Sequence, residues 1–477
     1  MASYVERKDR LLARLRSGRG SAAGLAKRTS SNRFRYQPTG PEIRRLDLSG
    51  FSHCVALDAR AQTLEVEGLA TFESIVDYTL TQGFVPHVTP ELKHITIGGA
   101  IVGIGIESNS YRYGFVHDSL MEADVLLPGG EIVHCSPEGE HGELFRSLPN
   151  SYGTLGYILR AKIRVMPVKR FVHLTTTPYD DVDVFLEAMQ AATERPDVDF
   201  VEGLFFDERR LFLVMSRFTD AVPRVDDILR HHVFYKLVLE QPDVYLTTKD
   251  YLFRYDPDWF WNFPEGVFYR MFRRYAPRSM RNSGFYKRYM EWKDALLERL
   301  PWEGQGNDEP LIQDWEVPWE EAAALTRFAL REIDLGGRPW IVVGIRTPLT
   351  PMLYPIRAGV LYYNLGCYCQ VKERPEKGPY WYTRILDREC FTRGGVKMLY
   401  SSHFLSREEF DRLYNGPHYR AIKARYDPRG LFGDVYGKTV LHLDTARTDM
   451  YSIVARADSD AAGAKASSRE ERPRRIP

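Results

Sequence analysis

The alternation of apolar and polar positions between residues 54 and 166 predicts a unit that mixes strands with one amphipathic helix. Residues 54–58 and 63–68 have the two-residue period of strands on either side of a turn. Helical spacing follows in Phe72, Ile75, Val76, Thr79 and Leu80, with Thr71 placed to cap the helix and Gly83 placed to end it. A hairpin over 123–135 and an apolar strand over 155–166 complete this unit.

From residue 171 the pattern changes to a second strand–helix–strand order, which indicates a separate sheet. Strands are expected at 173–177, 205–216, 340–345 and 360–365, and helices at 182–192, 407–414 and 418–426. The sequence therefore predicts an α+β fold. The first domain is expected at 35–170 and a substrate-binding cap domain at 171–445.

Three segments differ from these two domains. Residues 1–34 are basic, and Leu11, Leu12 and Leu15 predict a short surface helix, with a membrane-surface anchor as the alternative. Residues 245–292 form an insert in which aromatic side chains interleave with arginines, which is typical of a membrane interface or a tunnel mouth for lipid chains, or of ordinary core. Residues 446–477 are rich in Ala, Ser, Arg and Glu and are expected to be disordered.

Composition narrows the functional classes. The chain has 477 residues and a net charge of +1, so no nucleic-acid partner is expected. No apolar run is long enough to span a membrane, and five cysteines do not make a disulfide framework, so a cytoplasmic protein is expected, with peripheral contact to the inner membrane face as a further alternative. Cys367 and Cys369 have the spacing of a strand rather than of a metal site, and no metal is predicted.

A glycine-dense stretch over residues 96–114 is the first candidate site. Backbone N–H groups can cradle a diphosphate where side chains do not block the approach, and hydroxyls at Thr96, Ser108 and Ser110 could add donors. The spacing is neither that of a Rossmann loop nor that of a Walker A loop. A second small-residue segment, 151–158, strengthens the prediction of a nucleotide-cradling loop. The alternative is a set of glycine turns that only link strands.

The order T-I-G-G, G-I-G-I-E-S-x-S-x-x-Y-G, L-P-G-G and G-T-L-G-Y-I, followed by Lys423–Pro428, resembles proteins with an FAD-binding domain of the vanillyl-alcohol oxidase and p-cresol methylhydroxylase (PCMH) type. The resemblance implies a two-subdomain FAD-binding domain followed by the cap domain. Residues 27–32 are expected in place of the usual first pyrophosphate loop, and the absence of a histidine there predicts non-covalent FAD. The resemblance implies that FAD is held mainly by Thr96, Ile97, Gly98, Gly99, Gly103, Gly105, Ser108, Ser110, Gly114, Gly153, Thr154, Gly156 and Ile158.

Within that family the chain is most similar to the delta-24 sterol reductases, which implies reduction of an isolated carbon–carbon double bond with NADPH as electron donor. Such an alkene has no carbonyl to polarise it, so hydride delivery has to be paired with a positioned acid. The candidate acids are Glu107, Glu202, Tyr400 and His403. For each of them a structural role in a loop, strand or packed segment is the alternative.

Four functions remain open. We expect a reductase that converts a methylene-branched fatty acyl chain to its methyl form, as bacterial reductases similar to the sterol reductases do, with a lipid methyltransferase acting in the preceding step. A sterol side chain is the alternative substrate. The third function is that of an FAD-dependent alcohol or sugar oxidase, and the fourth is that of a non-catalytic lipid-binding protein.

Overall fold

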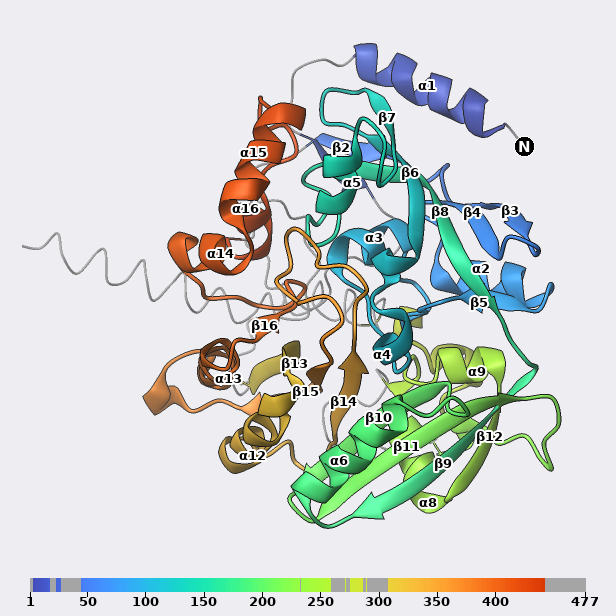
Figure 1. Cartoon of the computed structure of the whole chain (residues 1–477), viewed down its shortest axis with the longest axis vertical. Coiled ribbons are helices and arrows are strands. Elements are labelled where there is room, and N and C mark those ends of the chain that lie inside the picture. Colours follow the sequence, from blue (N-terminus) through green and yellow to red (C-terminus); the bar gives the residue numbers. More distant parts are fainter. Residues whose placement is uncertain are drawn as a thin grey trace, which may run out of the picture.

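The structure is a computed structural model that describes residues 3–17, 23–26, 44–231, 233–258, 271, 275–285, 289 and 308–441. The predictions for residues 27–32, for parts of the aromatic insert (259–270, 272–274, 286–288 and 290–292) and for the tail at 446–477 fall outside these residues. Two antiparallel sheets and the helices around them confirm the predicted α+β class (Figure 1).

The first sheet forms an N-terminal unit. Its strands are β3 (Cys54–Asp58), β4 (Thr63–Glu67), β8 (Tyr157–Pro167), β6 (Leu120–Leu126) and β7 (Ile132–Cys135), in that spatial order, and β5 (Phe84–Pro86) also pairs with β8. Helix α2 (Phe72–Leu80) begins where predicted, because the Thr71 side chain accepts the N–H of Ser74. The two N-terminal strands and the hairpin are confirmed.

The glycine-dense stretch is more helical than the loop that the sequence predicted. It holds α3 (Ile97–Gly103) and α4 (Ser110–Tyr113), with the 3-10 helix η1 (Val116–Ser119) after them. The side chain of Thr96 caps α3 by accepting the N–H of Gly99, and Ile97 and Ile101 are buried. The Thr96 cap and the burial of the apolar side chains therefore stabilise a helix here more than the glycines destabilise it.

The second unit is built on an eight-stranded antiparallel sheet. Its spatial order is β12 (Asp243–Thr247), β9 (Phe171–Tyr179), β11 (Arg210–Thr219), β10 (Phe200–Asp207), β14 (Trp340–Ile345), β15 (Tyr362–Lys372), β13 (Asp308–Pro318) and β16 (Val396–Lys397). The prediction of one strand over 205–216 is wrong, because the chain turns between β10 and β11. The carboxylate of Asp207 accepts the N–H of Arg209 and a side-chain N–H of Arg210, which stabilises the turn.

The two faces of this sheet have different surroundings. Helices α6 (Val182–Thr193), α12 (Ala322–Glu332) and α13 (Trp381–Thr392) cover one face, where Trp315, Tyr363 and Leu365 join a buried apolar cluster. Residues of β10, β14 and β15 on the other face, among them Leu204, Ile345 and Tyr362, belong to the large cluster that also contains the core of the N-terminal unit. Polar side chains that alternate into this second face therefore lie between the two units.

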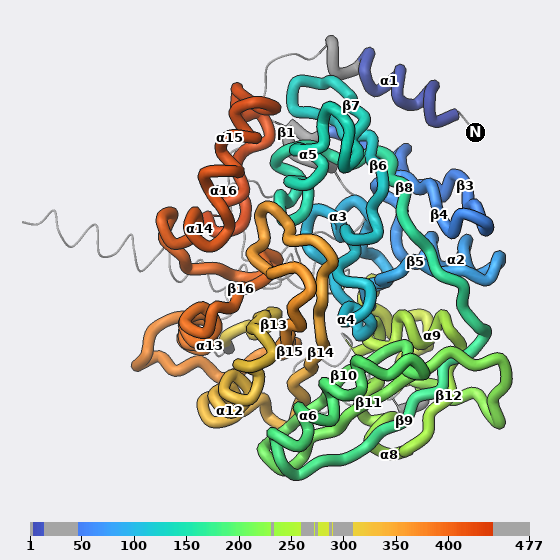
Figure 2. Tube along the Cα trace, in the orientation of Figure 1, coloured from blue at the N-terminus to red at the C-terminus, as the bar shows by residue number. Residues whose placement is uncertain are grey.

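The chain ends bring further elements to the N-terminal unit. The C-terminal helices α14 (Arg407–Leu413), α15 (Gly416–Tyr426) and α16 (Val435–Thr439) return to it, and Figure 2 shows α15 beside α5 (Gly142–Ser147). The capping box of Ser406 and Glu409 is confirmed. The remaining described α-helices and β-strands are α1 (Tyr4–Ser17), β1 (Ala23–Ala26), β2 (Arg44–Asp47), α7 (Ile228–His231), α8 (Phe234–Glu240) and α9 (Thr248–Leu252).

Helix α1 lies against the N-terminal unit. Leu11 is buried in a small cluster with Leu46 and Phe51, and the Tyr4 hydroxyl donates to Asp124 over 2.7 Å. Part of the predicted leucine stripe is thus used inside the molecule. Among the described residues, no helix has the length and apolar character needed to cross a membrane.

Candidate active site

The two small-residue segments predicted to hold the cofactor lie side by side. The backbone N–H of Tyr152 donates to the carbonyl of Val102 over 3.0 Å, and the Tyr152 hydroxyl donates to the carbonyl of Gly103 over 3.1 Å. The end of α3 is therefore joined directly to segment 151–158, which follows it by about 50 residues in the chain.

Some backbone amides of these segments are already used by the protein. The N–H groups of Ile97 and Gly98 donate to the carbonyls of Ala70 and Gly68, and that of Gly99 donates to the Thr96 hydroxyl. A Cβ at Gly98 would lie 2.8 Å from the carbonyl oxygen of Gly68. At the start of α3, glycine thus serves a close approach between two backbone segments.

Other amides remain available to a ligand. The backbone N–H groups of Gly105, Ile106 and Gly153 donate to no acceptor in the described part of the chain. Ile104 and Tyr152, directly beside them, have the left-handed φ angles of 59° and 51°, which non-glycine residues rarely adopt. Strained backbone of this kind is concentrated at ligand sites in proteins. The structure thus places free donors at 105–106 and 153 rather than at 97–99.

Buried polar atoms without a hydrogen-bond partner occur at the same segments. They include Oδ1 of Asn109 and Asn150, Oγ1 of Thr89 and both ring nitrogens of His117. Groups of this kind are costly unless a ligand or water satisfies them. Together with the free amides they fit a large polar cofactor such as FAD, for which residues 105–106, 109, 150 and 153 would supply donors and acceptors.

The remaining predicted cofactor residues hold the loops of the site. The Ser110 hydroxyl accepts the N–H of Glu107, and the Thr154 hydroxyl donates to the carbonyl of Ser151. Gly114 has a φ angle of 69°, and a Cβ at Gly156 would lie 2.5 Å from Val125. Ile158 is buried, and its carbonyl oxygen leaves no room for a side chain at Gly68. Their contact with FAD stays a prediction.

Two of the candidate acids, Glu107 and Glu202, are bound to one buried arginine. Arg254 donates to Glu107 over 2.7 Å and to both oxygens of Glu202 over 3.1 and 2.8 Å. The Tyr255 hydroxyl also donates to Glu202, and the Ser108 N–H donates to Glu107. All three charged side chains are at least 95% buried, so the ion pairs are shielded from water.

The ion pairs of Arg254 influence the pKa values of Glu202 and of Arg254 itself. Burial raises the pKa of Glu202, although Arg254 opposes that shift. The two carboxylates raise the pKa of Arg254, against the effect of burial, and keep it cationic. Arg254 follows α9 and was not predicted as a site residue. Its partners Glu202 and Glu107 are 52 and 147 positions away in the chain, and no local sequence pattern connects residues so far apart.

A second polar cluster lies on the sheet face between the units. Asp314 and Glu316 project from β13, and Asn364 and Tyr368 from β15, which is its neighbour. The Tyr400 hydroxyl donates to Asp314 over 2.5 Å. Glu316 accepts from Tyr354 over 2.6 Å and from Asn364 over 3.0 Å. We call Glu91, Asp314, Tyr368 and Tyr400 the acid–tyrosine cluster.

Glu91 connects this cluster to the N-terminal unit. It hydrogen-bonds with Tyr368, and burial together with the negative charge of Glu107 raises its pKa well above the usual value. Burial also raises the pKa of Asp314, to about 6, while Tyr400 opposes the shift. Glu91, Tyr368 and Tyr400 are half-buried, so a ligand can still contact them, whereas Asp314 is buried. Glu91, Asp314 and Glu316 were not among the predicted acids.

The fourth candidate acid, His403, is buried. Its Nε2 is 3.0 Å from the carbonyl oxygen of Met398, and its ring packs edge-on against Tyr414. Cys367 and Cys369 alternate in β15 as expected, with Sγ atoms 3.4 Å apart. No group of metal-ligating side chains occurs among the described residues.

The C-terminal motif 423–428 contacts the second small-residue segment. Lys423 donates to the carbonyl of Thr154 over 2.5 Å and pairs with Asp427 over 2.7 Å. Asp427 accepts the N–H groups of Leu431 and Phe432, and the Tyr419 hydroxyl donates to the Thr154 hydroxyl. Helix α15 therefore fixes this segment from outside.

Comparisons with known proteins agree with this geometry. Residues 42–136, which include α3 and α4, match the family described as FAD binding domain. The chain is 25% identical to human Delta(24)-sterol reductase over 404 residues, covering 80% of this chain and 75% of the relative, and 24% identical to the Arabidopsis thaliana enzyme over 442 residues, covering 83% and 76%. Cytokinin dehydrogenase 10 of rice is 28% identical over 156 residues, 32% of this chain and 28% of the relative. The protein is therefore an FAD-dependent oxidoreductase with a PCMH-type FAD-binding domain, similar in both of its units to Delta(24)-sterol reductases.

Proposed function

We propose that this protein is an FAD-dependent reductase that saturates an isolated carbon–carbon double bond of an apolar lipid, with NADPH as electron donor and FAD bound non-covalently. The likeness to Delta(24)-sterol reductases supports the reductase class, because it extends through the second unit. The likeness to a cytokinin dehydrogenase covers 32% of the chain, much less than the 80% covered by the sterol reductases.

The acid–tyrosine cluster carries this proposal. Bound FAD supplies hydride transfer to carbon. Saturation of the alkene also consumes one proton, which the protein has to deliver to the other carbon. Glu91 suits this role, because its pKa is raised well above the usual value, which favours the protonated acid, and because part of its surface is accessible.

The tyrosines of the cluster provide a route for replacing that proton. Tyr368 hydrogen-bonds with Glu91 and Tyr400, and Tyr400 donates to Asp314. Asp314 is buried and acts as a positioning residue that accepts the hydrogen bond of Tyr400. In this proposal Glu107 and Glu202 bind Arg254 and do not serve as acids, and the predicted role of Tyr400 becomes that of a relay.

For the substrate we propose a methylene-branched fatty acyl chain, which a lipid methyltransferase would supply in the preceding step. Its 1,1-disubstituted double bond accepts a proton at the terminal carbon and hydride at the branched carbon. A sterol side chain is the second candidate, because the relatives that cover most of the chain are named for it. The enzyme would act at the inner face of the membrane, where such lipids reside.

Stopped-flow spectroscopy separates the two half-reactions. NADPH should bleach the bound FAD rapidly, and the unsaturated lipid should restore the colour. Glu91→Gln should leave bleaching unchanged and slow recovery by about 100- to 10,000-fold, as expected for the loss of a general acid. Glu187→Gln, on the exposed side of α6, is the control.

The remaining candidate functions give different results in the same assay. Bleaching by an alcohol or sugar but not by NADPH would identify an oxidase, and a colourless protein that takes up no FAD would identify a lipid-binding protein. Mass spectrometry of cellular lipids with and without the protein identifies the substrate. A methylene-branched acyl chain should accumulate without the protein, and a change confined to sterols would favour the second candidate.

A further inference from the structure

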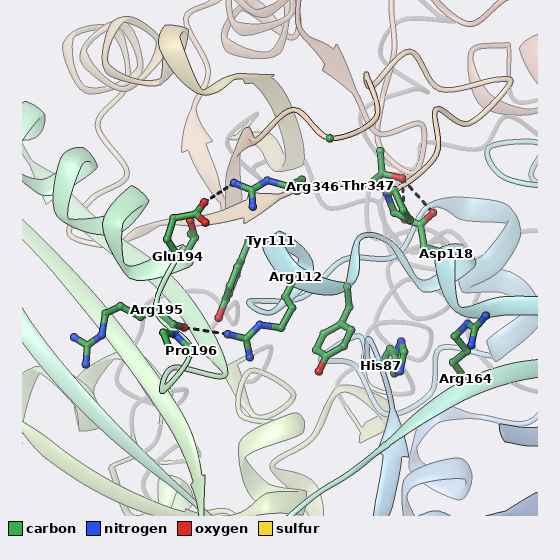
Figure 3. A pocket seen from close by; sticks show the side chains of 14 residues that line it. His87, Tyr111, Arg112, Asp118, Arg164, Glu194, Arg195, Pro196, Arg346 and Thr347 are labelled. Atoms are coloured by element: carbon green, nitrogen blue, oxygen red, sulfur yellow. Dashed lines mark hydrogen bonds and ion pairs between the residues drawn. The ribbon is translucent and has the colours of Figure 1, made fainter. Parts of the chain in front are cut away.

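An open cavity of about 540 Å³ lies where the N-terminal unit meets the second unit (Figure 3). The cavity is lined by Tyr111, Arg112 and Tyr113 of α4, by Arg195 after α6, by Arg346 after β14 and by Arg164 of β8. In the view of Figure 3, Arg112 lies between Arg195 and Arg164. No role in the reaction described above has been given to these side chains. We call this cavity the arginine groove.

Partners within the protein hold most of these arginines in place. Arg346 donates to Glu194 over 2.6 Å, and Arg112 donates to the carbonyls of Arg195 and Val198 over 3.1 and 2.8 Å. A guanidinium has five N–H donors, so each of these arginines keeps donors for a ligand. Their positions are fixed before any ligand binds, which lowers the entropic cost of binding.

Arg164 is different from the others. Its side chain is exposed and has no ion pair in the described part of the chain. The carboxylates that line the groove, Asp118 and Glu194, are engaged by Thr347 and Arg346. Asp199 and Asp197 pair with Arg112 and Arg195. Arg164 is therefore the one groove guanidinium that has no ion-pair partner among the described residues.

The floor near Arg164 is aromatic. The rings of His87 and Tyr113 pack with centroids 4.6 Å apart. Burial, helped by the charge of Arg164, lowers the pKa of His87 to about 4, so the imidazole is neutral at pH 7. Uncharged rings beside guanidinium groups, here inclined by 40° to each other, suit contact with a planar base attached to a phosphate.

We propose that the arginine groove binds a phosphate ester carrying a planar ring, and that the ligand is the phosphorylated adenosine end of NADPH. The volume lies in the range of small-molecule sites, and arginine forks match phosphate geometry. Helix α4 begins with the predicted flavin residue Ser110, carries the groove residues Tyr111–Tyr113 and is followed by the predicted flavin residue Gly114, so a dinucleotide anchored here would lie beside the predicted flavin segment. The choice of NADPH rests on the proposed function.

Equilibrium dialysis of FAD-loaded protein with NADP⁺ and NAD⁺ tests this proposal without turnover. Arg164→Gln and Arg346→Gln should each weaken NADP⁺ binding by about tenfold to a hundredfold, the effect of removing one charge-assisted contact, and should change NAD⁺ binding much less. Adenosine 2′,5′-bisphosphate should compete with NADP⁺. Arg429→Gln is the matched control, because Arg429 is exposed, lies outside the groove and has no ion pair in the described residues.

A phospholipid headgroup is the other source of a phosphate ester. Vesicles containing phosphatidylglycerol, compared with vesicles of phosphatidylcholine alone, test it with the same variants. If Arg164→Gln weakens vesicle binding but not NADP⁺ binding, the groove binds phosphate and the choice of NADPH is wrong. If it weakens neither, the proposal is overturned. If NADPH bleaches FAD rapidly in both variants and its affinity is unchanged, NADPH does not bind in the arginine groove, and the proposed function still stands.

Discussion

The guanidinium of Arg254 in the second unit lies 2.7 Å from the carboxylate of Glu107 in the N-terminal unit, and both side chains are buried. Arg254→Met would leave Glu107 and Glu202 without a counter-ion. Removing one partner of a buried ion pair costs about 3–5 kcal/mol, so the free energy of unfolding should fall by that amount. Urea denaturation measures it, with the exposed Arg429→Met as control. A loss below about 1 kcal/mol would contradict the assigned role of the ion pair.

The stability of the protein should depend on the protonation of Asp314. Its pKa is about 6 in the folded protein against a usual value of 3.8, so the folded state binds the proton more tightly. This contribution is fully present below pH 3.8 and is lost as the pH rises through 6, and it amounts to about 3 kcal/mol. Asp314→Asn should abolish it. The difference in unfolding free energy between variant and wild type should therefore change between pH 4 and pH 7, and a constant difference would refute the shift.

Lys423 connects α15 to segment 151–158. Lys423→Met removes the bond to the Thr154 carbonyl and the partner of Asp427, which costs about 1–3 kcal/mol. Because Gly153 and Thr154 are predicted to hold FAD, the affinity for FAD should fall about tenfold. Recovery of flavin fluorescence on dilution reports the affinity. Arg425→Met, on the exposed side of the same helix, should retain the affinity of the wild type, and equal losses in both variants would argue for a general effect on α15.

Helix α1 is attached to the N-terminal unit through few contacts. Leu11→Ala should weaken the attachment by about 2 kcal/mol, which corresponds to a roughly 30-fold larger detached population. Limited proteolysis within residues 4–17 should accelerate accordingly. Val5→Ala serves as control, since Val5 is 59% exposed. The side chain of Arg7 in the same helix pairs with Glu67. Unchanged cleavage of the Leu11 variant would show that Tyr4 and Arg7 hold the helix without Leu11.

Local patterns were sufficient for most elements of the N-terminal unit. Thr71 and Ser406 cap the helices predicted for them, because a cap depends on residues three positions away. The turn after Asp207 was missed because apolar residues continue on both sides of it. In α3 the capping hydroxyl of Thr96 and two buried isoleucines outweighed the glycines, which the sequence analysis had interpreted as loop.

The candidate site was predictable in part. The glycine segments were found because they are contiguous, but which amides remain free depends on carbonyls such as that of Gly68, which only the fold brings close. Asp314 and Glu316 alternate with the buried Trp315 and Val317 in β13, and that alternation was the available signal for a polar face. Tyr400, which donates to Asp314, is 86 residues away in the chain, and no periodic sequence pattern connects residues at that separation.

The loop that precedes α4 is joined to the second sheet through its backbone. The carbonyl of Ser108 accepts the N–H of Val201, and that of Ser110 accepts the N–H of Arg346. Together with the buried salt link at Arg254, these bonds oppose any swinging apart of the two halves. The proposed lipid substrate would therefore enter and leave through local side-chain movements while the two units stay together, so its exchange rate should not depend on a hinge between them.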